Sequence, residues 1–83
     1  MDARREVGLL INSLRAKAPN EQAMSDLTVN LHKALGAAQE KNKQGVADAM
    51  KTAFGNLNAL GAKNIDVLLE VEEIEEKIKQ IAE

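Results

Sequence analysis

Apolar residues recur at intervals of three and four along most of this chain, which is the spacing of one face of an α-helix. The first stripe consists of Val7, Leu10, Ile11 and Leu14. It predicts a helix that begins at Asp2 or Ala3 and ends before Pro19, because a residue that precedes proline is driven out of helical dihedral angles.

A second stripe follows this proline and consists of Met24, Leu27, Leu31, Ala34 or Leu35, and Ala38. We expect Pro19 or Asn20 to open this helix, since proline suits the first helical position and asparagine suits the N-cap. The stripe lapses over residues 40–45, EKNKQG, which predicts a turn between two helices near residues 41–44. The alternative is one long helix that continues through Gly45, because Asn and Gly each destabilise a helix by no more than about 1 kcal/mol.

Two further stripes complete the chain. The third consists of Val46, Met50, Ala53, Phe54, Leu57 and Leu60, and the fourth of Val67, Val71, Ile74, Ile78 and Ile81. Gly61 fits the left-handed position just past the third helix. We expect Asn64 to cap the fourth helix, with Asp66 near the positive end of its dipole. The period-two alternation of a β-strand does not occur.

Small residues gather in the second and third segments, namely Gly36, Ala37, Ala38, Ala47, Ala49 and Gly55. Small side chains let two helix backbones approach closely, so these residues predict tight antiparallel packing of the two segments. The alternative is that they are merely tolerated in helices.

These patterns predict an all-α fold, a compact bundle of three to four helices with antiparallel neighbours, because the connections are short. Residues 1–83 are expected to form a single helical domain. The chain is 45% hydrophobic but 1% aromatic and has no cysteine, so neither disulfides nor thiolate metal sites reinforce its core. A small core of this kind often gains stability by oligomerising, which predicts a homo-oligomer.

The stripe in the last helix gives the strongest indication of a binding surface. Leu68 and Leu69 widen its start, as in a bundle core, whereas past Ile74 it narrows to single residues, as in a coiled-coil-like seam. The predicted partner or oligomer interface consists of Val71, Ile74, Ile78 and Ile81.

The charge of this helix differs from that of the preceding chain. Residues 66–83 hold seven acids and two lysines, a net charge of −5, so residues 1–65 carry +3 of the overall −2. This asymmetry predicts a charge match within the chain or with another molecule. The pattern leaves open whether the acidic helix binds its own chain or a partner.

No pattern of a catalytic, cofactor-binding or metal site occurs. His32 is the single histidine, and its helical neighbours offer neither a base partner nor further metal ligands. The glutamates of residues 70–76 are typical of a solvated face rather than a cation cage, and the chain has no glycine-rich phosphate loop. We therefore expect no cofactor, no metal and no enzymatic activity.

Nucleic-acid binding is also disfavoured. A helix-turn-helix can be forced onto residues 45–60, GVADAMKTAFGNLNAL, but its second helix has almost no basic side chains. Lys41, Lys43 and Lys51 do not make a dense basic face of the kind that binds phosphates.

The chain has no apolar stretch near the ~20 residues needed to cross a bilayer and no signal peptide pattern. We expect a soluble cytoplasmic protein, complete from Met1, with no membrane partner. In general character it resembles small helical bacterial or phage proteins, without the motifs of any one family. The favoured function is a non-enzymatic, self-associating interaction module that binds another protein, as a small regulator, inhibitor or adaptor. The alternative is a structural assembly subunit, a scaffold or chaperone-like component.

Overall fold

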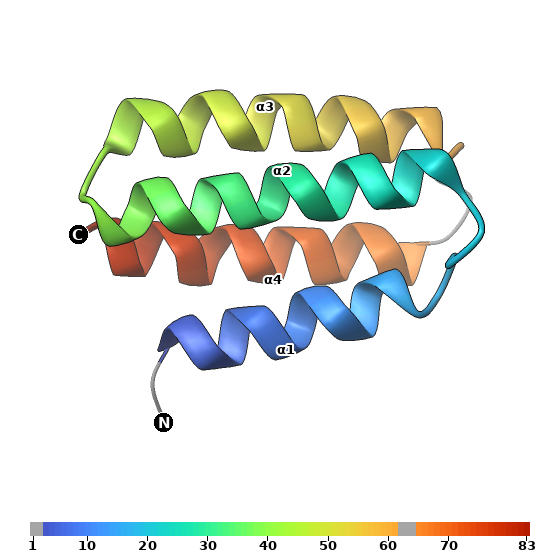
Figure 1. Cartoon of the computed structure of the whole chain (residues 1–83), viewed down its shortest axis with the longest axis horizontal. Coiled ribbons are helices and arrows are strands. Elements are labelled where there is room, and N and C mark those ends of the chain that lie inside the picture. The colour runs from blue at the N-terminus through green and yellow to red at the C-terminus, as the bar shows by residue number, and fades with distance from the viewer. Residues whose placement is uncertain (1–2, 62–64) are drawn as a thin grey trace.

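The computed structural model describes residues 3–61 and 65–83. Within them the chain forms four helices: α1 (Ala3–Arg15), α2 (Gln22–Gln39), α3 (Lys43–Ala59) and α4 (Ile65–Ala82). Successive helices run in opposite directions (Figure 1). The predicted all-α bundle with antiparallel neighbours is therefore confirmed, and it has four helices rather than three.

The turn between α1 and α2 lies further along the chain than the sequence indicates. Pro19 and Asn20 occupy the middle of a turn that is closed by the N–H of Glu21, which donates to the carbonyl of Ala18 at 3.2 Å. Glu21 is the N-cap of α2, and its side chain makes no capping hydrogen bond. The prediction that Pro19 or Asn20 opens the second helix is wrong, because proline also suits this turn position.

The turn between α2 and α3 falls where the apolar stripe lapses. Lys41 adopts a left-handed conformation with φ 60°, and its N–H donates to the carbonyl of Ala38 at 3.0 Å. The next N–H, of Asn42, reaches the carbonyl of Ala37 at 2.9 Å, which completes a Schellman ending for α2. Asn42 then caps α3, since its side chain accepts from the N–H of Gly45 at 3.0 Å. The single long helix is excluded, and Gly45 lies in the first turn of α3 rather than at the break.

The other predicted helix ends agree with the structure where it describes them. Gly61 follows the end of α3 with φ 65°, and its N–H donates to the carbonyl of Asn58 at 3.0 Å. Asp66 lies in the first turn of α4. The expected cap at Asn64 lies outside the described residues.

One hydrophobic core runs along the bundle and receives side chains from all four helices. Thr28 is a buried polar residue there, and its hydroxyl donates to the carbonyl of Ser25 at 2.9 Å. The α2–α3 pair has the most extensive contact, and the α3–α4 pair has the least of the helix pairs that touch. None of the described helices is both long and apolar enough to span a membrane.

The small residues of α2 and α3 contribute unequally to this contact. Gly36, Ala47 and Gly55 are exposed, so their assignment to the interface is wrong. The backbones come close at Gly45 instead, where an added Cβ would lie 3.1 Å from the Cβ of Ala37. Further along the pair, a side-chain hydrogen bond of 2.7 Å joins Asn30 to Asn56.

Candidate binding groove

The apolar stripe of α4 packs into the core of its own chain. Val71, Ile74 and Ile78 have no exposed area, and Ala82 is the last buried member, whereas Ile81 is half-buried at the margin. Three of the four predicted interface residues are therefore covered by helices of their own chain. The physical reason is that all four helices close around this face, which leaves no seam past Ile74 open to solvent. Self-association itself stays a prediction.

Part of the expected charge match is intramolecular and joins α4 to α1 and to the turn that follows α1. Lys17 Nζ lies 3.1 Å from Glu70 Oε2, and Lys77 Nζ lies 2.8 Å from Glu6 Oε1. The hydrogen bond to Glu6 is the main cause that raises the pKa of Lys77 above its ordinary value. These two pairs fasten α4 to α1 and to the turn that follows it.

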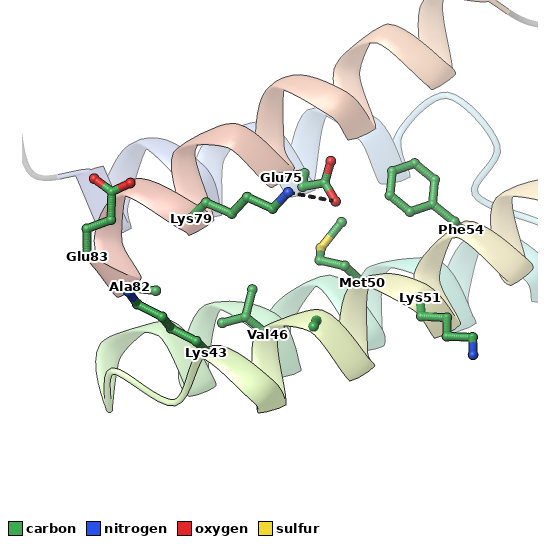
Figure 2. A pocket seen from close by; sticks show the side chains of 10 residues that line it. Lys43, Val46, Met50, Lys51, Phe54, Glu75, Lys79, Ala82 and Glu83 are labelled. Atoms are coloured by element: carbon green, nitrogen blue, oxygen red, sulfur yellow. Dashed lines mark ion pairs between the residues drawn. The ribbon is translucent and has the colours of Figure 1, made fainter.

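A surface groove lies between α3 and α4, with a volume of about 490 Å³. Figure 2 shows Met50 and Phe54 reaching from α3 toward α4 across this hollow. Val46, Met50 and Ala82 belong to the core and form the floor of the groove, while Phe54 is half-buried beside them. The groove is therefore a place where the apolar interior reaches the surface.

Charged side chains surround this floor. On the α4 side, Lys79 Nζ lies 3.8 Å from Glu75 Oε2, so these two charges largely offset each other (Figure 2). On the α3 side, Lys43 and Lys51 line the groove, and neither makes an ion pair within the described part of the chain. Lys43 is also the first residue of α3, where the helix dipole is positive. The α3 rim therefore favours an anionic group.

The residues of this groove stand out only weakly in the sequence. Periodicity places Phe54 in the apolar stripe of the third helix, and Lys43 and Lys51 suggest no more than phosphate contacts. The stripe of α3 is wide, because Phe54 follows the fully buried Ala53 directly. A stripe wider than the core can cover leaves apolar area at the surface, but only the position of α4 shows where.

The rest of the described surface has weaker candidates for a binding site. His32 is exposed on α2, and the described residues contain no group of three or more His, Asp or Glu side chains that could hold a metal ion. A smaller hollow of about 260 Å³ lies near Met24 and Leu60. Another, lined by Arg4 and Lys41, borders the point where Lys41 Nζ donates to the carbonyl of Ile81.

The chain matches no family model, no curated protein and no solved structure. Its fold class alone supports many functions. The α3–α4 groove, with its apolar floor and basic rim, is therefore the feature from which a function is argued.

Proposed function

We propose that this chain is a non-enzymatic helical interaction protein that binds a helix of a partner protein in the α3–α4 groove. This is the way in which small regulators, inhibitors and adaptors commonly act. The observation that carries the proposal is the apolar groove, with Met50 at its floor and the half-buried Phe54 beside it, next to the unpaired lysines of α3. An amphipathic helix laid into an apolar groove is a recurring mode of protein recognition.

The position of the groove supports this proposal. Ile74 and Ile78 of α4 are fully buried without any occupant in the groove, so a partner helix can dock without opening the bundle. Docking would cover the remaining exposed area of Phe54 and Ala47, and burial of apolar area gives roughly 25 cal/mol per Å² before the costs of association. The lysines at the rim then select partners whose helix carries acids on that side.

Ordered self-association as a structural assembly subunit is the second candidate. It is supported by Leu69 on the outward side of α4, whose side chain is 57% exposed, among exposed glutamates. A weak nucleic-acid interaction has the least support, because Lys43 and Lys51 at the groove do not make a dense basic face of the kind that binds phosphates.

The test captures partners from a host lysate with three forms of the chain: wild type, Ala47→Glu and Leu9→Gln. A glutamate at position 47 occupies the groove and lies one turn from both Lys43 and Lys51, which neutralises the rim. Leu9 is a matched control, since it is 56% exposed on α1, away from the groove. We expect a partner that mass spectrometry finds with wild type and with Leu9→Gln but not with Ala47→Glu.

Thermal unfolding checks that all three forms are equally folded. A set of captured proteins that Ala47→Glu leaves unchanged would contradict the proposed role of the groove.

A further inference from the structure

We infer that the helix which fills the α3–α4 groove is α4 of a second copy of this chain. The inference rests on the proposed function, in that it takes the groove as a docking site, and it names the occupant. Its basis is that the outward face of α4 carries an apolar side chain and carboxylates, which complement the apolar floor and the lysines of the groove.

The outward face of α4 lies opposite the buried stripe. Leu69, Glu73 and Glu76 are spaced by four and three, so they share one side of the helix, and all three are exposed. The side chain of Leu69 is 57% exposed. This face is thus an apolar anchor followed by carboxylates.

The charges of the two surfaces are complementary. Along α3, Lys51 lies about 4 Å and Lys43 about 16 Å from Phe54 at 1.5 Å per residue. Along α4, Glu73 lies about 6 Å and Glu76 about 10 Å from Leu69 by the same rise. With Leu69 of the second copy against Phe54 and the two helices antiparallel, Glu73 lies level with Lys51, and Glu76 lies between the two lysines.

The other exposed apolar side chains lack this correspondence. Leu9 on α1 has both Arg5 and Glu6 one turn away, so its face offers no net negative charge to the lysine rim. Val29 on α2 has both Asp26 and Lys33 one turn away, with the same consequence. Among the described large apolar residues that are exposed, Leu69 is the one with an acidic surround.

The groove and the outward face of α4 are different surfaces, so the contact is head-to-tail. Each copy offers one groove and one acidic face, and such contacts build rings or open chains rather than a closed symmetric dimer. The masses of the assemblies should therefore rise with concentration beyond that of a dimer, and salt should weaken the association by screening the charges.

The first experiment measures the mass of the purified full chain by light scattering and sedimentation over a range of concentrations. We expect wild type and Leu9→Gln to associate alike, and we expect Leu69→Gln and Ala47→Glu each to weaken association by about tenfold or more, as for loss of an anchor residue. Leu69 and Ala47 are both exposed, and circular dichroism confirms that each variant keeps its helicity.

The second experiment mixes the two defective variants. Ala47→Glu retains its acidic face and Leu69→Gln retains its groove, so a head-to-tail contact predicts a 1:1 heterodimer that grows no further. Neither variant alone should form it. A mixture that stays monomeric, or a Leu69→Gln variant that associates as well as wild type, would overturn the inference.

The outcomes separate this inference from the proposed function. A wild type that is monomeric at about 500 µM overturns the inference, because this concentration is well above the dissociation constants of specific stable interfaces. If capture from the lysate still depends on Ala47, the proposed function then stands. Self-association without such capture supports the occupant named here and favours the assembly subunit over the adaptor.

Discussion

Helix α3 meets two neighbours through two different faces, and the two contacts have little in common. Toward α2, Gly45 lets the backbones approach near Ala37, and Asn56 forms a hydrogen bond with Asn30 across the pair. Toward α4, Met50 and Phe54 border a groove of about 490 Å³. The first face is closed and the second is open, although both belong to one helix in one bundle.

The difference follows from side-chain size. Small residues on both helices allow many atoms of the two backbones to come into contact, and such dispersion contacts are individually weak but numerous. A large side chain without a matching neighbour keeps the opposite helix away and leaves room beside itself. The closed face therefore mainly stabilises the bundle, and the open face is available to another molecule.

The largest expected effect is that of Ile78→Asp, because α4 forms one wall of the groove only while its stripe stays in the core. Ile78 has no exposed area, so the substitution buries an unpaired carboxylate and should destabilise the fold by about 4 kcal/mol or more. That is a large part of the roughly 5–10 kcal/mol typical of a domain of this size. Circular dichroism during urea titration measures the loss.

Ile81→Asp is the matched control, since Ile81 is half-buried at the edge of the same helix. We expect it to cost about 1 kcal/mol. If Ile78→Asp keeps full helicity and stability, then α4 is not held by the core of its own chain, and the groove beside it has no fixed wall.

The second prediction compares the two faces of α3 by the same change, alanine to leucine, at one position on each face. Ala53 is fully buried, so Ala53→Leu overpacks the core and should cost about 1–3 kcal/mol. Ala47 lines the groove and is exposed, so Ala47→Leu should change stability by less than about 0.5 kcal/mol. Urea midpoints at equal denaturant slope measure both changes. Equal costs at the two positions would show that the open face is as tightly packed as the closed one.

A smaller effect is expected from the hydrogen bond on the closed face. Asn30 Nδ2 donates to Asn56 Oδ1 at 2.7 Å, in a partly buried position. A double-mutant cycle with Asn30→Ala and Asn56→Ala should give a coupling free energy of about 1 kcal/mol. A coupling near zero would mean that this hydrogen bond adds nothing to the apolar packing of α2 against α3.

The sequence predicts the closed parts of this molecule better than the open one. The helical period reveals which side of each helix is buried, because burial of an apolar stripe is a property of one helix. The left-handed conformation of Gly61 is predicted for a similarly local reason, since it depends only on the end of its own helix. The lapse of the stripe predicts a turn near residues 41–44, and the structure has it at residues 40–42, with Lys41 rather than a glycine as the left-handed residue.

The features that the sequence does not predict depend on how helices lie relative to one another. The stripe of α4 ends at Ala82 rather than Ile81, which depends on the rotation of α4 against its neighbours. Similarly, Lys77 pairs with Glu6 of α1 at 2.8 Å, which depends on how α1 lies against α4. The groove exists because α3 and α4 stand apart, and no single helix encodes that distance.

The smallest expected effect concerns α1 and α4, a third kind of contact that surface charges help to fasten. The pKa of Lys77 is raised above 10.5, first by the hydrogen bond to Glu6 and also by the nearby charges of Glu73 and Glu76. A raised pKa means that the fold stabilises the protonated lysine, so this contribution is complete below pH 10.5 and disappears as the pH rises through the raised value.

Glu6→Gln should therefore lower the pKa of Lys77 toward its ordinary value, as measured by NMR titration of the lysine side chain. Glu73→Gln is the control, because Glu73 raises the same pKa only through its charge and should have a smaller effect. The stability difference between wild type and Glu6→Gln should be present near pH 8 and should disappear as the pH rises through the raised pKa of Lys77. It should also shrink in high salt, because both partners are partly exposed. A difference that persists undiminished at the alkaline end would show that Glu6 supports α1 by packing against α4 rather than by its charge, which would make this contact resemble the closed face of α3.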